Sequence, residues 1–187
     1  MTTNQRQRII TRLNGRTRLD AFEAAKAVWE DPEPRLERAL LSTLKHGRRP
    51  FNRAAAAFAM QILKTPKGIR ALERTVANKS KNPRVRGEAA EALAHGHRKK
   101  SHDVLLRGLG DPSKDVRFWC AFSLGEMAEG RAATALKGLA ATDKRVIRGW
   151  HSVAKEAADA LNNIEAARKD WRKGRCVFCV RQAGPPF

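Results

Sequence analysis

The sequence predicts an all-α solenoid, a fold in which short helical hairpins stack side by side. Three observations predict it. One pattern of residues recurs every 31 to 37 residues along the chain. Apolar residues recur at helical spacing between groups of turn-forming residues. Such a hairpin cannot bury its apolar stripe alone, so the copies must stack into one continuous core.

The repeated pattern is clearest from Asp111 onward, where the sequence reads DPSKDVRFWCAFSLGEMAEGRAATALKGL. It combines an Asp-Pro turn, a helix that starts with Val-Arg and continues with Ala-x-x-Leu, and a second apolar helix. The previous copy reads NPRVRGEAAEALAHG followed by SHDVLLRGL. Equivalent core positions follow at spacings of 32, 33, 31 and 37 residues and are occupied by Val28, Met60, Leu93, Leu124 and Leu161. Each copy is therefore one helical hairpin.

These residues resemble the HEAT-like repeat of the type first described in phycobilisome lyases, over about residues 19–165. The resemblance implies an all-α, right-handed α-solenoid of four to five HEAT-like helical hairpins, whose concave face is lined by the Val-Arg helices. It also implies that Arg86 and Arg117, which follow the repeat Val, pair internally with Asp residues of neighbouring turns, such as Asp111 or Asp115. HEAT-like arrays serve many functions, so the fold does not select one.

Turn-forming residues divide the chain into its expected elements. A basic N-terminal helix is expected over residues 1–18, the repeat array over 19–171, and an irregular C-terminal tail over 172–187. The last helix, from about Val146 to Trp171, is longer than the others and should close the array. The turns are DPEP at 31–34, HGRRP at 46–50, TPKG at 65–68, NKSKNP at 78–83, HGHRKKS at 95–101, GDPSKD at 110–115 and ATDKR at 141–145.

The composition favours an anionic partner. The chain has 38 Lys and Arg against 19 Asp and Glu, a formal charge of +19. Such a surface attracts nucleic acid, acidic proteins or anionic lipid. The sequence has no apolar run long enough to span a membrane and no signal-peptide pattern. Three cysteines, an odd number, favour a reducing compartment over a disulfide framework. We therefore expect a cytoplasmic protein without a membrane partner.

Basic residues are frequent in the turns that precede the Val-Arg helices. In a solenoid these turns lie along one edge, at helix N-termini whose free N–H groups favour anions. The candidate nucleic-acid-binding residues are Arg48, Arg49, Arg53, Lys79, Lys81, Arg84, Lys114, Lys144, Arg145 and Arg148. Two considerations weaken this interpretation. Solvated loops are often basic, and five acids interrupt the row: Asp31, Glu33, Asp111, Asp115 and Asp143.

A second candidate surface consists of Phe118, Trp119 and Phe122. A helix that buries the repeat Val places Phe118 and Phe122 on the opposite side and Trp119 on a flank. Neighbouring copies have small or charged residues at these positions. The three aromatic residues could stack bases or anchor a protein partner. Alternatively, they pack against an adjacent helix or the tail.

The sequence predicts no catalytic centre, no metal site and no cofactor. Its histidines are scattered without a paired acid at a telling spacing, and no Gly-rich phosphate loop occurs. Cys176 and Cys179 have CxxC spacing but lack the second ligand pair that structural zinc needs. Their segment, with Val177, Phe178 and Val180, more readily covers the end of the last repeat.

Two enzyme families that use this repeat are minor alternatives, the HEAT-like alkylpurine DNA glycosylases and the bilin lyases. The glycosylase resemblance implies an Asp one turn beyond a Trp of the concave face. Ser123 follows Trp119 at that spacing, and Ala154 follows Trp150, so this Asp is missing. Nothing in the sequence identifies a bilin pocket.

The sequence therefore predicts a non-catalytic binding module. In the leading hypothesis its basic surface holds a nucleic-acid backbone, DNA or RNA, within a larger complex. The alternative is a protein–protein adaptor that docks an acidic partner through the aromatic residues of the concave face. No small-molecule substrate is expected for either function.

Overall fold

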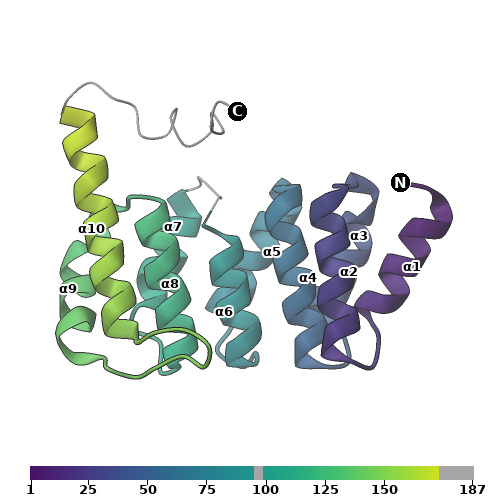
Figure 1. Cartoon of the computed structure of the whole chain (residues 1–187), viewed down its shortest axis with the longest axis horizontal. Coiled ribbons are helices and arrows are strands. Elements are labelled where there is room, and N and C mark those ends of the chain that lie inside the picture. The colour runs from purple at the N-terminus through teal and green to yellow at the C-terminus, as the bar shows by residue number, and fades with distance from the viewer. Residues whose placement is uncertain (95–98, 173–187) are drawn as a thin grey trace.

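The structure is a computed structural model that describes residues 1–94 and 99–172. Helices account for the regular structure of these residues, and their only bridge of strand type joins Val146 to Ser152. The helices stack along one axis in two layers (Figure 1). This arrangement confirms the all-α solenoid that the repeat predicts.

The first layer contains the Val-Arg-type helices α2 (Arg18–Glu30), α4 (Pro50–Leu63), α6 (Pro83–Ala92), α8 (Lys114–Glu126) and α10 (Val153–Arg172). The second layer contains α3 (Glu37–His46), α5 (Pro66–Ala77), α7 (Lys99–Gly108) and α9 (Ala133–Thr142). Helix α1 (Thr3–Leu13) packs against α2 at the N-terminal end. Short 3-10 turns precede α3 and α9, at Pro34–Leu36 and Gly130–Ala132.

Judged by which sequence neighbour each helix packs on most closely, the helices of the described residues form five hairpins, in the upper part of the predicted range of four to five. Each Val-Arg-type helix pairs with the helix before it, whereas the sequence repeat joined it to the helix after it. Each second-layer helix packs closely on the helix that follows it, as in α3 with α4 and α9 with α10, and α1 packs on α2 in the same way. The predicted basic segment 1–18 is therefore the first half of a hairpin. It comprises α1, a loop and the first residue of α2.

Local sequence signals set where the Val-Arg-type helices begin. The Thr17 hydroxyl accepts from the Asp20 amide at the start of α2, and the Asn82 side chain accepts from the Arg84 amide at α6. Helices α4 and α6 begin at a proline, which lacks the N–H that a first helical turn leaves unbonded. These signals put five loops on one side of the array, which we call the lower edge: residues 14–17, 47–49, 78–82, 109–113 and 143–152.

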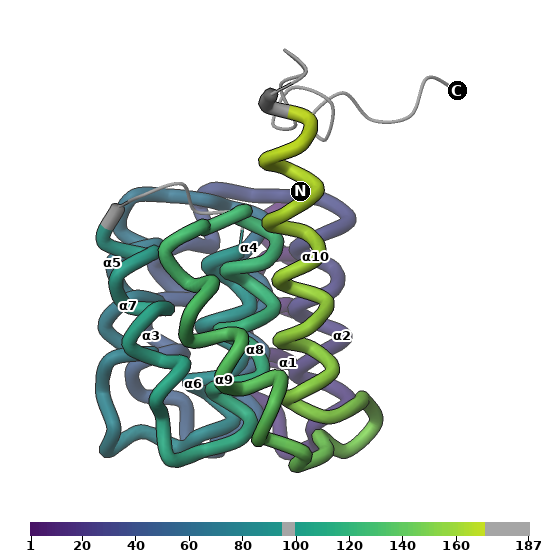
Figure 2. The backbone as a smooth tube through the Cα atoms, turned by 90° about the vertical axis from the view of Figure 1, so that its left-hand side faces the viewer, coloured from purple at the N-terminus to yellow at the C-terminus, as the bar shows by residue number. Residues whose placement is uncertain are grey.

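Small side chains let the first layer pack closely. Helix α4 buries Ala54, Ala55, Ala56, Ala57 and Ala59. A Cβ at Gly125 of α8 would lie 2.7 Å from the Ala160 Cα of α10, so glycine permits that helix contact. Viewed along the array in Figure 2, α2 and α10 stand further out than the helices between them. The open face of the first layer is therefore concave.

The expected start of the last helix at Val146 is wrong, because α10 begins at Val153. Residues 143–152 instead form a loop. The Val153 amide donates to the Arg145 carbonyl, and the Ala154 amide donates to that of Asp143. These bonds and the Val146–Ser152 bridge hold the loop against the end of α10. Residues 173–187 of the predicted tail lie outside the described residues.

Candidate functional site

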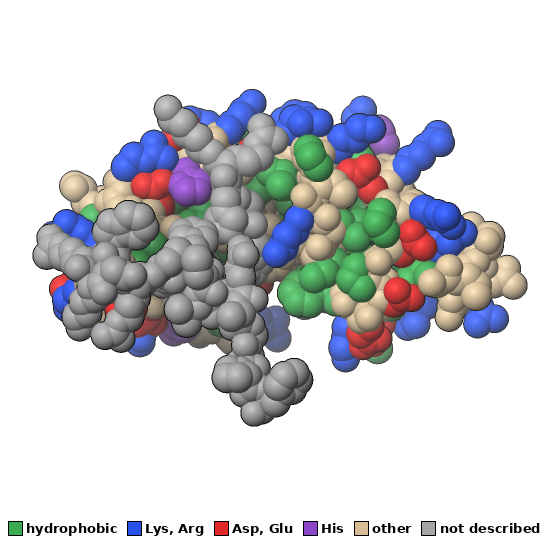
Figure 3. Space-filling view, turned by 90° about the horizontal axis from the view of Figure 1, so that it is seen from above, with side chains coloured by type: hydrophobic (Ala, Val, Ile, Leu, Met, Phe, Trp, Pro, Cys, Tyr) green, Lys and Arg blue, Asp and Glu red, His purple; other side chains and the backbone are tan. Residues whose placement is uncertain are grey.

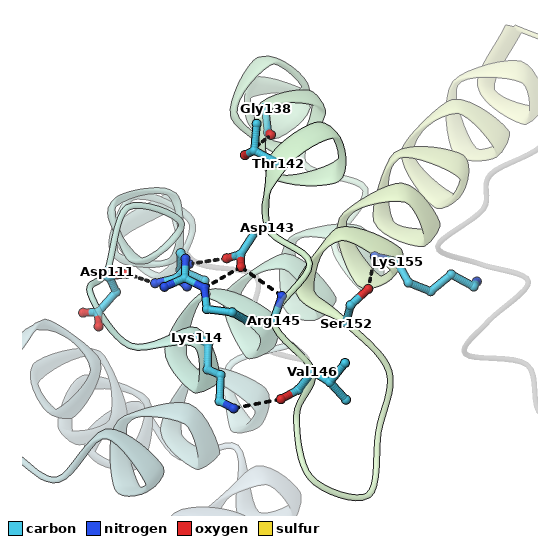
Figure 4. A network of polar contacts seen from close by, with 10 residues as sticks. Asp111, Lys114, Gly138, Thr142, Asp143, Arg145, Val146, Ser152 and Lys155 are labelled. Atoms are coloured by element: carbon cyan, nitrogen blue, oxygen red, sulfur yellow. Dashed lines mark hydrogen bonds and ion pairs between the residues drawn. The ribbon is translucent and has the colours of Figure 1, made fainter.

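A buried ladder of Arg–Asp pairs lies just inside the lower edge. The Arg86 guanidinium donates two hydrogen bonds to the Asp111 carboxylate, and Arg117 Nε donates to Asp143 Oδ2 at 2.7 Å. Arg117 also donates to the Asp111 carbonyl. The predicted structural role of Arg86 and Arg117 is therefore confirmed. Figure 4 shows Asp143 beside Arg145, which donates to it as well.

The ladder removes two acids from the exposed surface of the lower edge. Asp111 and Asp143 are only 6% and 5% exposed. Burial raises the pKa of each carboxyl, but the hydrogen bonds from arginines and backbone amides outweigh it, so the pKa of both stays below the usual value. Both groups are thus ionised and neutralised internally. The expectation that they interrupt the basic row is wrong for these two residues.

All ten predicted nucleic-acid-binding residues lie on the lower edge or in the first turn above it. Three of them donate hydrogen bonds from their side chains: Arg53 to the Gly47 carbonyl, Lys114 to the Val146 carbonyl, and Arg145 to Asp143. Figure 4 shows Lys114 reaching Val146. The other seven have no carboxylate partner within residues 1–94 and 99–172, and they are Arg48, Arg49, Lys79, Lys81, Arg84, Lys144 and Arg148.

Sequence reasoning missed two cations of the same edge. Arg16, in the 14–17 loop, and Arg18, the first residue of α2, are both exposed, and the Arg18 guanidinium lies 5.5 Å from the centre of the Phe22 ring. Both residues fell into the predicted N-terminal helix because the first hairpin has lost the Val-Arg signature. The Thr17-x-x-Asp20 cap was the signal that could have placed them in a loop.

The opposite, upper edge differs in charge. Seen from above in Figure 3, hydrophobic side chains gather over part of it, and acidic residues lie among the basic ones. Its loops contain Asp31, Glu33 and Glu129, which pair with the N-terminus, Arg6 and Arg131 respectively. The upper edge also has exposed cations, such as Lys64 and Lys67, but its three acids are all at least partly exposed, whereas Asp111 and Asp143 of the lower edge are buried.

The prediction that Phe118 is exposed is wrong, because its side chain is fully buried. The 143–152 loop covers it. Phe118 packs with Ile147 and Val153 in a small core of its own, and the ring of His151 lies 5.3 Å from it. Helical geometry placed Phe118 correctly away from the main core. It could not predict that the 143–152 loop covers Phe118, because the sequence suggested a helix from Val146.

Trp119 and Phe122 do lie partly exposed on the concave face. Their rings meet edge to face at 5.7 Å, and Trp119 meets Trp150 in the same way at 5.2 Å. Trp150, in the loop before α10, is 56% exposed. The sequence analysis did not assign Trp150 to this aromatic surface, because the loop that delivers it was expected to be helical.

Two carboxyls of α6, Glu88 and Glu91, lie on the same open face. Both are partly buried, and burial raises the pKa of each to about 7. Arg84 and Arg18 lower the pKa of Glu88 somewhat, and Glu88 raises that of Glu91 further. The described part of the chain offers neither carboxyl a hydrogen bond or an ion pair. They contrast with the Arg-bound acids of the ladder.

The remaining predicted features give no further site. Cys120 is a buried thiol whose pKa is raised by burial. No cluster of three potential metal ligands occurs within residues 1–94 and 99–172, while Cys176, Cys179, His95 and His97 lie outside the described residues. Of the helices in those described ranges, none is both long and apolar enough to cross a membrane.

Comparison with known proteins identifies the repeat. Residues 75–162 match the family model of HEAT repeats. These residues run from the end of α5 into α10 and include both rungs of the Arg–Asp ladder. No curated protein matches the chain. Together with the two-layered stack of helices, the match shows that the chain is a HEAT-like helical repeat protein.

Proposed function

We propose that this HEAT-repeat module holds a nucleic-acid backbone along its lower edge. The observation that supports the proposal most is that most cations of this edge have no carboxylate partner, while two of its Asp side chains are buried in ion pairs. Seven predicted Lys and Arg residues, together with Arg16 and Arg18, have no carboxylate partner in the described ranges, and all of them except the partly buried Arg49 and Lys81 are exposed. Asp111 and Asp143 are buried against Arg86 and Arg117.

The repeat gives the cations a spacing suited to a long polyanion. Packed helices lie about 10 Å apart, so five loops extend over roughly 40 Å. At about 3.4 Å per base pair, that length corresponds to about 12 base pairs of duplex. The loops also sit at helix N-termini, whose free amides and dipole favour phosphate. Such contacts position a backbone and do not read base sequence.

The test compares two variants with the same loss of charge. The edge variant combines Arg48→Gln, Lys79→Gln, Lys81→Gln and Lys144→Gln. The control variant combines Arg38→Gln, Lys67→Gln, Arg70→Gln and Lys137→Gln, exposed cations away from the lower edge. Binding of a fluorescent 20-base-pair duplex, a single strand and an RNA is measured by anisotropy across a salt series.

For the wild type we expect a slope of log affinity against log salt of about −4 to −5, because each neutralised phosphate contributes about −0.9. The edge variant removes four cations and should therefore lose up to about 3.6 from the magnitude of that slope, whereas the control variant should keep it. Equal losses in the two variants would show that binding depends only on net charge. Absence of binding at low salt would exclude the function.

A second candidate is a protein adaptor that uses the concave face, as HEAT repeats commonly do in interaction scaffolds. The observation that favours it is the exposure of Trp150 beside the partly exposed Trp119 and Phe122. Binding hot spots are enriched in tryptophan. Trp150→Ala should then abolish capture of a protein partner and leave duplex binding unchanged.

A further inference from the structure

The concave face has an electrostatic character opposite to that of the lower edge. We call its central part the concave groove. Its residues are Glu88 and Glu91 of α6, Trp119 and Phe122 of α8, and Trp150 of the loop that precedes α10. All five side chains are at least partly exposed, and they come from two neighbouring first-layer helices and the loop that precedes α10. The groove therefore combines carboxyls with the faces and edges of aromatic rings.

The two kinds of side chain are neighbours. A Cβ on Gly87 would lie 2.8 Å from Trp119 Cδ1, so the indole ring rests against α6 one residue before Glu88. Trp119 in turn contacts Phe122 and Trp150, with centroid distances of 5.7 and 5.2 Å. Because these contacts are edge to face, the rings stand at steep angles to one another, and the cluster has a ridged rather than a flat surface.

The carboxyls of the groove lack the cations that this chain has in excess. The protein has twice as many basic as acidic residues. Glu88 and Glu91 nevertheless form no ion pair within residues 1–94 and 99–172, although Arg84 and Arg18 lie close enough to Glu88 to lower its pKa somewhat. Asp115 of α8 extends the acidic character of the same face. Carboxyls without an ion-pair partner in the protein can bind a ligand of opposite charge.

We infer that the concave groove binds a cationic segment of a partner protein, with an Arg or Lys side chain placed between the α6 carboxyls and the Trp119–Trp150 rings. A guanidinium can donate hydrogen bonds to a carboxylate and stack on an aromatic ring at the same time. The carboxyls oppose a nucleic-acid backbone here, and they also oppose the acidic partner that the sequence suggested for the aromatic residues. The groove and the lower edge are thus separate sites for ligands of opposite charge.

The probe is a fluorescein-labelled decapeptide of alternating Arg and Gly, and its counterpart with Gln in place of Arg is the uncharged reference. Anisotropy is measured with the full chain at pH 8 and 150 mM salt, where charges beyond about 8 Å are largely screened. The test variant is Glu88→Gln with Glu91→Gln. The matched control is Glu30→Gln with Glu165→Gln, exposed acids outside the groove.

We expect saturable binding of the Arg peptide only, at least about tenfold weaker in the Glu88→Gln, Glu91→Gln variant and nearly unchanged in the control. Trp150→Ala should also weaken it. Thermal melts establish that each variant is folded, and duplex binding of all variants should remain at the wild-type value, which separates this inference from the lower-edge function. Equal weakening in both double variants, or no saturable binding by the wild type, would overturn the inference.

Discussion

The acids of the ladder and the acids of the concave groove experience opposite environments in one fold. Asp111 and Asp143 are buried, but arginines of the adjacent Val-Arg-type helices bind them, and the pKa of each is lowered. The pKa of Glu88 and of Glu91 is instead raised to about 7, because burial is offset only in part by Arg84 and Arg18 at Glu88 and is reinforced by Glu88 at Glu91. The comparison separates acids that the fold neutralises with its own arginines from acids that have no ion pair and could bind a cationic ligand.

Breaking the ladder should have the largest effect on stability. Asp143→Asn would leave Arg117 buried without its counter-charge, which costs about 3–5 kcal/mol in comparable buried pairs. Asp103→Asn is the control, because Asp103 and Arg131 form an exposed pair that is worth at most about 1 kcal/mol. Urea denaturation of the two variants measures the difference. Similar midpoints would contradict the structural role of the ladder.

The groove carboxyls should destabilise the fold at high pH. Their pKa is higher in the folded chain than in the unfolded chain, so the stability they contribute is complete below about pH 4.5 and is lost as pH rises through about 7. Glu88→Gln with Glu91→Gln should therefore stabilise the protein at pH 8, on the order of 2 kcal/mol, and have little effect at pH 5. Arg84, Arg18, Asp115 and Glu126 face the same region and remain in both proteins.

Thermal melts of the wild type and this variant from pH 5 to pH 8 measure that difference. The range stays above pH 4.5, where Glu129 begins to lose the stability that comes from its lowered pKa of about 2. A variant that is less stable than the wild type at pH 8 would mean that the two carboxyls have partners in solution.

The contact between Gly87 and Trp119 should be sensitive to one methyl group. Gly87→Ala places a Cβ 2.8 Å from the Trp119 ring and 3.4 Å from the Asp115 carbonyl, so the ring must move. We expect a loss of about 1 kcal/mol in unfolding free energy and a change in tryptophan fluorescence. Gly138→Ala is the control, since a Cβ there meets no atom within 4 Å. An unchanged emission spectrum for Gly87→Ala would contradict the packing.

The exposed cations of the lower edge should matter least for folding. Arg48→Gln should change the free energy of unfolding by less than about 0.5 kcal/mol, because Arg48 has no partner in the described residues. It should still weaken duplex binding in a small step. A single substitution that removes all binding would favour a local hot spot over a distributed edge.

The repeat predicted the fold well because its signals are local and recur. The Val-Arg step identified Arg86 and Arg117 as structural, and the turns located every predicted cation on one edge. The position of the 143–152 loop over α8 could not be predicted. This loop buries Phe118 and exposes Trp150, and backbone hydrogen bonds from Val153 and Ala154 hold it in place. That Glu88 and Glu91 lack ion-pair partners could not be predicted either, because ion pairs depend on which residues the fold brings together and not on their spacing in the sequence.

The most direct test of the lower-edge site is lysine footprinting of the protein alone and bound to the 20-base-pair duplex. Amine acetylation followed by mass spectrometry reports each lysine separately, so the lysines of other surfaces are internal controls. We predict that binding protects Lys79, Lys81 and Lys144 and leaves Lys64, Lys67 and Lys137 as reactive as before. Equal protection of both groups, or protection of the second group alone, would contradict a nucleic-acid site on the lower edge.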